Sequence, residues 1–286
     1  MILLDWNGLV IPALTAQKGA DLGDEDFVRH VILNSLRMYN KKYREKYGQM
    51  VIACDAGNVW RKDYFPEYKW SRKANRDKDS KIDWKAVFGI VTKIREEIVA
   101  NFHYKVVLVP RTEADDIIGV LVETTQEFGN CEEVMIVSSD KDFAQLQKYS
   151  NVHQFSPITK KVIKEPQPKT FLFEHCFKGD SSDGVPNILS ADDCFKEGVR
   201  QTALSAKRKA VFHANIDKLE SVMTESEYKN FIRNKKMIDL GDLPEEIVES
   251  ILNVYANVKT SSKLKIMNYL IKNRCRNLLE CVGDFH

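Results

Sequence analysis

The sequence predicts an α/β fold with a mainly parallel central sheet flanked by helices, followed by a helical C-terminal region. Short apolar runs of strand length, such as "QMVIAC" and "VMIV", alternate with longer segments whose apolar residues recur at helical spacing. Strands that alternate with helices usually pair in parallel through crossover helices. After about residue 165 this alternation stops, and helical segments with polar connections follow.

The elements of the core can be assigned in chain order. The opening run "MILLD" and the later run "QMVIAC" are short strands, and residues 25–47 and 83–102 have helical spacing, with Asp83 as the N-cap of the second helix. Two strand–turn–helix units follow, "YKVVLVPRTEADDIIGVLVETTQEFG" and "EEVMIVSSDKDFAQLQK". The runs "NVHQFSP" and "KKVIK" are two further short strands. We therefore place an α/β core at residues 1–165 and a helical C-terminal region at 166–286.

Composition narrows the class of protein. The chain has 286 residues, of which 43% are hydrophobic and 29% charged, so wholesale disorder is excluded. No apolar run approaches the roughly 18 residues of a membrane span, and no secretory signal is recognisable. The six cysteines are scattered without a C-x-x-C pair, as expected of reduced thiols. We expect a cytoplasmic protein without a membrane partner.

Acidic residues follow the predicted strands. The carboxyl ends of parallel strands share one edge of the sheet, which is where ligands bind in open α/β folds. Taken singly, an aspartate there is often a turn residue, and acids that begin a helix can simply cap it. Together they would repel one another unless they lie apart or divalent cations hold them. The acids at this edge are Asp5, Asp55, Glu113, Asp115, Asp116, Asp140 and Asp142.

The types of residue also limit the chemistry. Ligands that offer only oxygen suit Mg²⁺ or Mn²⁺ rather than Zn²⁺, and none of the six scattered histidines is assigned a role. Phosphate-loop, dinucleotide-binding and G-x-S-x-G motifs are all missing. The net charge is +2 despite the clustered acids, so the rest of the chain is basic. This distribution suits a protein that holds a polyanion and binds cations where it cuts.

Five motifs occur in the order "LLDWNGL", "IACDAG", "TEADDIIGVL", "VSSDKDFAQL" and "KGDSSDGVP". The series resembles the 5′-nuclease (flap endonuclease) family, and most closely its T4-type ribonuclease H branch. The similarity is strong over residues 1–190 and weaker through "MTESEYKNF" and "MIDLGDLP". It implies a PIN-like nuclease core and two Mg²⁺ ions, for which Mn²⁺ could substitute. The implied ligands are Asp5, Asp55, Glu113, Asp115, Asp116, Asp140, Asp142, Asp180 and Asp183.

Residues 60–81 correspond to the arch of that family. They hold eight Lys/Arg against four Asp/Glu, interleaved with aromatic residues, which suits a threaded single strand. A solvated charged loop is the alternative. The match of "YKWSR" to a Tyr-Lys-x-x-Arg pattern implies that Lys69 and Arg72 contact the scissile phosphate in a catalytic role. The nucleic-acid contacts expected in the arch are Arg61, Tyr68, Lys69, Arg72 and Arg76.

One departure from the family follows the last motif. Most relatives carry a glycine-rich helix-hairpin-helix there that grips duplex phosphates, whereas residues 187–212 contain no Gly-x-Gly. We therefore expect a divergent hairpin segment that binds duplex in altered form, and no monovalent-cation site is inferred. The expected contacts are Arg200, Lys207, Arg208 and Lys209.

The resemblance implies a metal-dependent 5′ nuclease with 5′→3′ exonuclease and flap endonuclease activity. It would cut phosphodiesters near the 5′ end of RNA or DNA annealed to DNA, and so remove RNA primers and flaps from lagging-strand fragments in phage replication. We expect a monomer in the host cytoplasm, with a sliding clamp and a single-strand-binding protein as candidate partners. Two alternatives stay open: a PIN-type nuclease of single-stranded RNA, which the later acids and the arch disfavour, and a non-catalytic DNA-junction binding protein, which retention of every acid disfavours.

Overall fold

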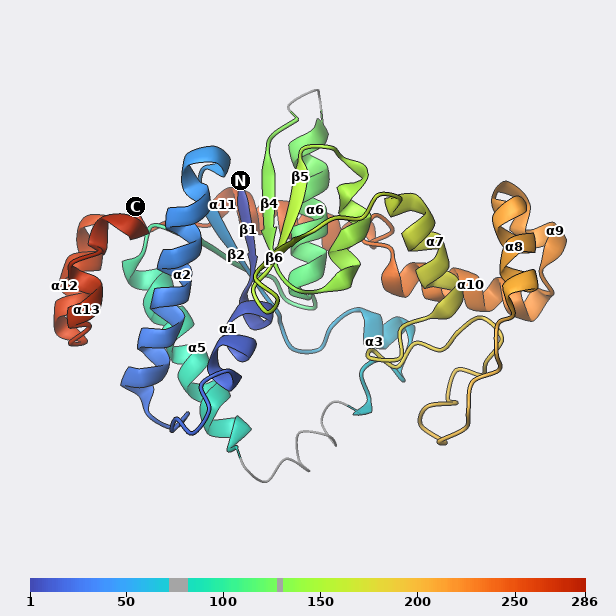
Figure 1. Ribbon diagram of the computed structural model, residues 1–286, viewed down its shortest axis with the longest axis horizontal. Coiled ribbons are helices and arrows are strands. Elements are labelled where there is room, and N and C mark those ends of the chain that lie inside the picture. Colours follow the sequence, from blue (N-terminus) through green and yellow to red (C-terminus); the bar gives the residue numbers. More distant parts are fainter. Residues whose placement is uncertain (72–81, 128–130) are drawn as a thin grey trace.

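The computed structural model describes residues 1–71, 82–127 and 131–286 (Figure 1). Its sheet has six strands in the order β3-β2-β1-β4-β5-β6. All neighbours pair in parallel except β5 and β6, which are antiparallel. The mainly parallel sheet predicted from the sequence is thus confirmed. The strands are β1 (Ile2–Asp5), β2 (Met50–Cys54), β3 (Lys105–Leu108), β4 (Val134–Val137), β5 (Val152–Ser156) and β6 (Lys161–Ile163).

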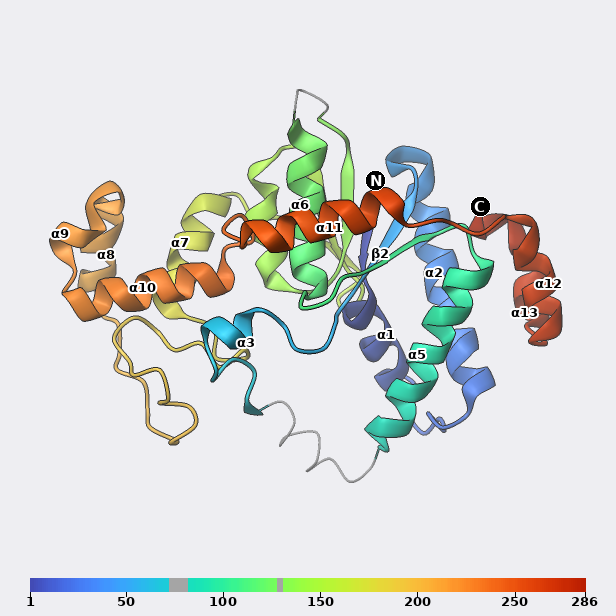
Figure 2. The same cartoon turned by 180° about the vertical axis from the view of Figure 1, so that it is seen from behind.

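Helices cover both faces of the sheet. Because successive side chains of a strand point to opposite faces, Ile2 and Leu4 join one buried cluster and Leu3 joins the other. The first cluster packs against α1 (Trp6–Thr15), α2 (Glu25–Tyr47) and α5 (Trp84–Asn101). The second packs against α6 (Ala114–Gln126) and α11 (Glu245–Asn257). Figure 2 shows α11 running across α6 on the back of the molecule.

The two long helices of the core begin as predicted. Asp24 caps α2 by accepting hydrogen bonds from two backbone N–H groups of its first turn, and Asp83 caps α5 by accepting one from Ala86. Two details differ from the expectation. A helix, α1, follows β1 directly, and the helix expected after β4 is the 3₁₀ helix η2 (Lys141–Lys148). Side chains at 138 and 140 accept hydrogen bonds from nearby backbone N–H groups there, which favours a tight local turn over an α-helix.

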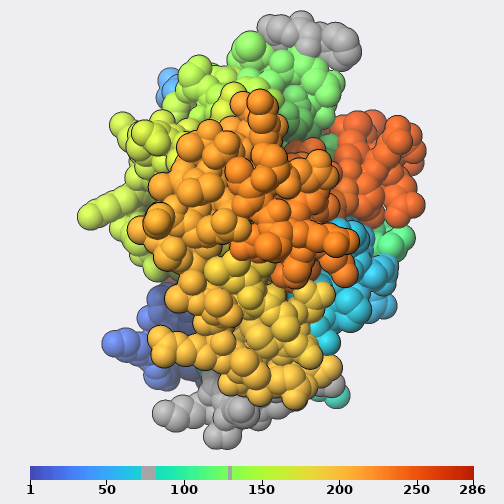
Figure 3. Space-filling view, turned by 90° about the vertical axis from the view of Figure 1, so that its right-hand side faces the viewer, coloured from blue at the N-terminus to red at the C-terminus, as the bar shows by residue number. Residues whose placement is uncertain are grey.

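The C-terminal region is helical, as predicted. Its elements are α7 (Pro168–Lys178), α8 (Ala206–Ala214), η3 (Ile216–Lys218), α9 (Leu219–Val222), α10 (Glu225–Ile238), α11, α12 (Leu264–Lys272), α13 (Arg276–Leu279) and η4 (Val282–Phe285). The first part packs against Phe65 and Tyr68, beside α3 (Arg61–Tyr64), in a third apolar cluster. Figure 3 shows this part beside the segment that contains α3. The last helices pack on the core, and the boundary near residue 165 stays a prediction. In the part of the chain that the structure describes, no helix is long and apolar enough to cross a membrane.

The segment expected to resemble a helix-hairpin-helix is mostly irregular. All of residues 187–205 are described, and they form turns and extended connections before α8 begins. The side chain of Asn187 accepts from Leu189 N and Ser190 Oγ and donates to Thr202 O. Such side-chain bonds to nearby backbone compete with helix formation. The segment therefore supplies one helix rather than a hairpin of two.

Candidate active site

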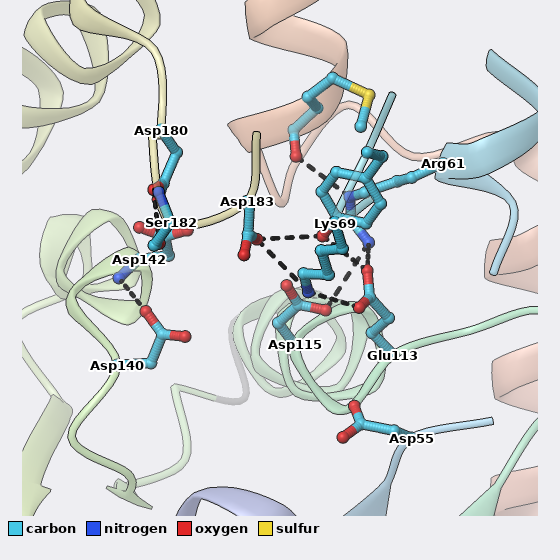
Figure 4. Close-up of polar contacts among 12 residues, drawn as sticks. Asp55, Arg61, Lys69, Glu113, Asp115, Asp140, Asp142, Asp180, Ser182 and Asp183 are labelled. Atoms are coloured by element: carbon cyan, nitrogen blue, oxygen red, sulfur yellow. Dashed lines mark hydrogen bonds and ion pairs between the residues drawn. The ribbon is translucent and has the colours of Figure 1, made fainter. Parts of the chain in front are cut away.

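The predicted acids lie at the carboxyl edge of the sheet. β1 pairs with β2 on one side and β4 on the other, so connections leave it in opposite directions and create the crevice in which open α/β folds bind ligands. Figure 4 shows Asp55 and Asp115 on one side of this edge and Asp140 and Asp142 on the other. Asp183 lies between them.

Asp5 ends β1 and caps α1. Its Oδ1 accepts from Gly8 N at 2.8 Å and its Oδ2 from Ser138 Oγ at 2.9 Å. A Cβ on Gly8 would stand 2.2 Å from Oδ2, so only glycine leaves room for the carboxylate. Burial, together with the neighbouring Asp55 and Asp140, raises the pKa of Asp5 to about 7.

Asp55 follows β2 and joins three elements of the core. It accepts hydrogen bonds from Asn7 Nδ2 at 2.6 Å and from Ala114 N at 2.8 Å. The second donor is in the first turn of α6, where unpaired N–H groups favour a carboxylate. The sequence analysis did not assign Asn7 a role, although it belongs to the motif "LLDWNGL".

Glu113 lies just before α6 and receives three side chains from the beginning of the arch. Its carboxylate accepts from Tyr68 Oη at 2.8 Å, Lys69 Nζ at 2.6 Å and Arg61 Nη1 at 3.1 Å. Burial alone would raise the pKa of Glu113, but the nearby Lys69 and Arg61 cations outweigh it and hold the pKa below its ordinary value. Glu113 is therefore ionised and already neutralised by protein groups.

Asp116 differs from the other acids because its carboxylate is fully enclosed. It is 0% exposed and accepts from Trp60 Nε1 at 3.1 Å and Glu113 N at 2.9 Å, while Arg61 Nη1 lies 2.8 Å away. Asp115 keeps 21% of its side chain exposed, and Arg61 lies 3.7 Å from it. Burial raises the pKa of Asp115 well above its ordinary value. Asp115 thus faces the crevice, whereas Asp116 contacts Trp60 and Arg61 in the interior.

Two residues that the sequence predicts to contact nucleic acid, Arg61 and Tyr68, are buried. Arg61 is 1% exposed and Tyr68 is 2% exposed, and both point toward the acids. Both side chains therefore contact the acids in this structure, and their contact with nucleic acid stays a prediction. Lys69 keeps 14% of its side chain exposed at the same edge. Arg72 and Arg76 lie outside the described residues.

The acids after β4 stand across the crevice. Asp140 caps η2 by accepting from Asp142 N at 3.0 Å. Burial, together with Asp140, raises the pKa of Asp142 to about 7. Asp180 accepts from Ser182 N and Oγ at 2.8 and 2.6 Å, and Lys141 Nζ lies 3.0 Å away. Burial works against ionisation of Asp180, but its contacts with nearby side chains outweigh that effect and hold its pKa well below the ordinary value.

A short loop presents Asp180 and Asp183. It is closed by a backbone bridge between Asp180 and Val185. Gly179 enters the loop at φ +67°, and a Cβ there would stand 2.4 Å from Val185 O, so the glycine of "KGDSSDGVP" is required by both backbone and space. Asp183 accepts from Tyr68 Oη at 3.1 Å, lies 3.3 Å from Lys69 Nζ, and accepts from Lys69 N through its carbonyl. Tyr68 and Lys69, in the described part of residues 60–81, thus contact the last acidic motif at the crevice.

The structure also brings in His175, which the sequence analysis left without a role. It lies on α7, is 7% exposed, and its ring stands between Asp142 and Asp180. These three residues offer ligand atoms within 4.8 Å of one another. A signal was present, because His175 precedes the motif "KGDSSDGVP" by only a few residues.

The expected duplex contacts lie in and before α8. Arg200 and Lys207 are exposed, while Lys209 is partly buried. Arg208 is paired with Glu227 at 2.6 Å. Figure 1 shows α8 beyond α7 at the end of the molecule. These four residues stay predicted contacts.

Comparison with known proteins gives the family. A model of the 5′-3′ exonuclease N-terminal resolvase-like domain matches residues 1–172, and a model of the T4 RNase H C-terminal region matches residues 168–285. The chain belongs to the 5′-3′ exonuclease family. Ribonuclease H of Enterobacteria phage T4 is 32% identical over 266 residues, covering 90% of this chain and 86% of that protein. The resemblance indicated by the motifs is thereby confirmed.

Other members of the 5′-3′ exonuclease family are more distant. A 5′-3′ exonuclease of Buchnera aphidicola is 29% identical over 245 residues, or 82% of this chain and 78% of its own length. The T5 5′-exonuclease with bound divalent zinc ions superposes with a TM-score of 0.65 at 13% identity over 90% of this chain and 98% of that one. A T5 flap endonuclease in a complex with DNA and metal ions gives 0.61 at 16% identity, covering 90% of this chain and 99% of that one. These structures confirm the fold.

Proposed function

We propose that this protein is a divalent-metal-dependent 5′ nuclease that removes RNA primers and 5′ flaps by cutting near the 5′ end of RNA or DNA annealed to DNA. The observation that carries the proposal is the convergence of carboxylates at one edge of the sheet. Those that follow β2, begin α6 and η2, and lie in the loop after α7 are drawn in Figure 4, and Asp5 of β1 lies close enough to Asp55 and Asp140 for their charges to raise its pKa. Membership of the 5′-3′ exonuclease family supports the reaction class. The similarity of this chain to a protein named ribonuclease H supports RNA paired to DNA as a substrate.

The donor set fits divalent cations. Asp5 and Asp142 have pKa values raised to about 7 by burial and by neighbouring carboxylates, so these acids are held close without full neutralisation. When bound, cations of the Mg²⁺ type would stabilise negative charge on the scissile phosphate and supply a nucleophilic water. Asp116 we assign a positioning role. The proposed ligands are Asp5, Asp55, Glu113, Asp115, Asp140, Asp142, Asp180 and Asp183.

The protein's own cations would place the substrate. Lys69 Nζ lies 2.6 Å from Glu113 Oε1 and 3.3 Å from Asp183 Oδ2, and we propose that it turns to the phosphate when substrate enters. The backbone at Lys69 has φ +54°, an uncommon value for a residue with a side chain. Such strain persists where surrounding contacts fix a functional side chain. Arg72, outside the described residues, is the proposed second phosphate contact.

The test is cleavage of two substrates: an RNA-primed DNA strand annealed to a template, and a DNA 5′ flap. Each is incubated with Mg²⁺, with EDTA, and with the variant D140N. The matched control is D217N, which makes the same change at an exposed residue of η3. Short 5′ products that require Mg²⁺, vanish in D140N and persist in D217N would support the proposal. Tight binding without cleavage under any divalent cation would instead support the junction-binding alternative.

Two finer parts of the proposal need separate assays. Cleavage of single-stranded RNA in preference to both annealed substrates would favour the PIN-type alternative. We propose from the replication role alone that the protein is a monomer in the host cytoplasm. The proposed partners are a sliding clamp and a single-strand-binding protein. Sedimentation and pull-down with purified replication proteins would test it.

A further inference from the structure

His175 occupies an unusual place for a histidine. It lies on α7, which packs against η2, and its ring is held edge-on by Phe171 at a centroid distance of 5.7 Å. Nδ1 lies 3.3 Å from Asp142 Oδ1, and Nε2 lies 3.4 Å from Asp180 Oδ2. The imidazole therefore fills the space between two acids that come from different elements.

The hydrogen bonding of this ring is incomplete. His175 is 7% exposed, and neither ring nitrogen has a hydrogen-bond partner among the described residues; the same holds for Asp142 Oδ1. Buried polar atoms are nearly always satisfied, because each one left without a partner costs about 1–3 kcal/mol. The unpartnered atoms of His175 and Asp142 lie close together and point to a partner that can bind one ring nitrogen and a carboxylate oxygen. A metal cation is a group that accepts lone pairs from both an imidazole nitrogen and a carboxylate oxygen.

The spacing of the atoms suits one ion. Ligand atoms of Asp142, His175 and Asp180 all lie within 4.8 Å of one another. An ion roughly 2.1 Å from each ligand holds neighbouring ligand atoms about 3 Å apart and opposite ones about 4 Å apart. Only modest side-chain movement would therefore close the group around an ion.

A competing explanation is that protonated His175 is itself the cation between the two acids. Charge-assisted hydrogen bonds are normally about 2.7–2.9 Å long, and both distances here are longer. Asp180 is in addition already contacted by Lys141 and Ser182. His175 contributes to the lowered pKa of Asp180, but the lengths of both contacts are those of a weak ion pair rather than of strong charge-assisted hydrogen bonds.

We propose that His175 is a metal ligand: one ring nitrogen binds a divalent cation together with Asp142 and Asp180, forming a mixed nitrogen–oxygen site that prefers Mn²⁺ or Zn²⁺ to Mg²⁺. Imidazole suits borderline transition cations, whereas Mg²⁺ favours oxygen ligands. The inference rests on the proposed function, because it concerns the same metal centre. It divides that centre into one all-oxygen position near Asp5 and Asp55 and one mixed position at α7.

Electron spin-echo spectroscopy of bound Mn²⁺ tests the ligand directly, because a coordinated imidazole gives a ¹⁴N coupling that carboxylates do not. The full-length protein would be measured with Mn²⁺ as the probe, beside the variants H175N and H175Q. The control is H30N, the same change on α2. Titration calorimetry with Mn²⁺ and Mg²⁺ on each protein gives the affinities.

The expected result is a ¹⁴N coupling in the wild type and in H30N that is lost in both His175 variants. Mn²⁺ affinity at one site would fall about tenfold or more, with Mg²⁺ affinity changed much less. Mn²⁺ binding without ¹⁴N coupling in the wild type overturns the inference even if both variants fail to fold. If the wild-type protein lacks the ¹⁴N coupling but still cleaves the flap substrate, the proposed function stands without the His175 ligand. If the wild-type protein binds no divalent cation and cleaves nothing, the His175 inference and the proposed function both fail.

Discussion

Replacing Arg61 by methionine separates the role that the structure gives this residue from the one that the sequence suggests. Arg61 Nη1 lies 3.1 Å from Glu113 Oε2 and 2.8 Å from Asp116 Oδ1, and its Nε donates to Met237 O at 3.0 Å. R61M keeps most of the apolar stem but leaves Asp116 without its cation, leaves Glu113 with the Lys69 cation, and removes a donor from Met237 O. The variant therefore isolates the loss of charge and hydrogen bonds from a loss of packing.

The expected cost of R61M is about 3–5 kcal/mol, the usual penalty for removing one partner of a buried ion pair. Uptake of a proton by Asp116, whose pKa burial already raises, keeps the cost within this range. This is a large part of the roughly 5–15 kcal/mol that stabilises a typical domain. The matched control is R111M, because Arg111 is 48% exposed and pairs with Asp63 at 2.7 Å. An exposed pair of this kind is worth about 1 kcal/mol or less.

Urea unfolding followed by far-UV circular dichroism measures both variants. Circular dichroism is preferred to fluorescence because the Arg61 guanidinium stacks 4.8 Å from the ring centroid of Trp60. R61K serves as a milder second variant that keeps the charge but not the planar fork. The salt dependence of DNA binding supplies the opposite test, since each lost phosphate contact lowers the slope by about 0.9. An R61M protein as stable as R111M, with a salt slope reduced by about one, would refute the positioning role.

Three further predictions use other parts of the molecule. G8A should lower the single-turnover cleavage rate about 100-fold by displacing the Asp5 carboxylate. The control G89A, where a Cβ meets nothing within 4 Å, should leave the rate unchanged. Equal cleavage rates for G8A and G89A would contradict the prediction. Burial would raise the pKa of Glu97, but its hydrogen bonds with Arg29 and Tyr269 outweigh burial and lower the pKa from 4.5. The unfolded state therefore binds more protons than the folded state. The stability that ionised Glu97 contributes is lost as the pH falls below about 4.5. E97Q should lose about 1–3 kcal/mol at pH 7 and show a shallower fall in stability between pH 7 and 3.5 in urea titrations, whereas parallel curves would count against the pair. Mg²⁺ or Mn²⁺ at about 100 times its dissociation constant should stabilise the protein by about 2.7 kcal/mol, seen as a higher melting temperature than in EDTA; identical melting would exclude tight binding.

The sheet and the strand-end acids were predictable because both depend on local pattern. Apolar runs of strand length fix β1, β2 and β4, and parallel pairing brings their carboxyl ends to one edge. Asp5, Asp55 and Asp140 could therefore be grouped before any coordinates were known. The short helix η2 was less accessible, because its form depends on side-chain hydrogen bonds to nearby backbone rather than on periodicity.

The positions of Arg61, Tyr68 and His175 could not be predicted from the sequence because each depends on a partner distant in the chain. Basic and aromatic residues in this segment predict solvent-facing contacts, yet Arg61 and Tyr68 both donate to Glu113, just before α6. The motif "KGDSSDGVP" lies just after His175, but it does not by itself place the ring beside Asp142. Its position between Asp142 and Asp180 arises only when α7 packs against η2.

The charges at the crevice indicate where cations are needed. Glu113 and Asp180 each lie within 3.0 Å of a lysine amine, and both have lowered pKa values although burial opposes ionisation. Asp5 and Asp142 lack a lysine or arginine contact of this kind in the described chain, and both have pKa values raised to about 7. Since the protein balances the first pair itself, an added cation gains most by binding beside the second pair. Under the proposed function, Asp5 at the end of β1 and Asp142 at the start of η2 would each lie beside a bound divalent cation, whose charge would replace the missing lysine or arginine contact.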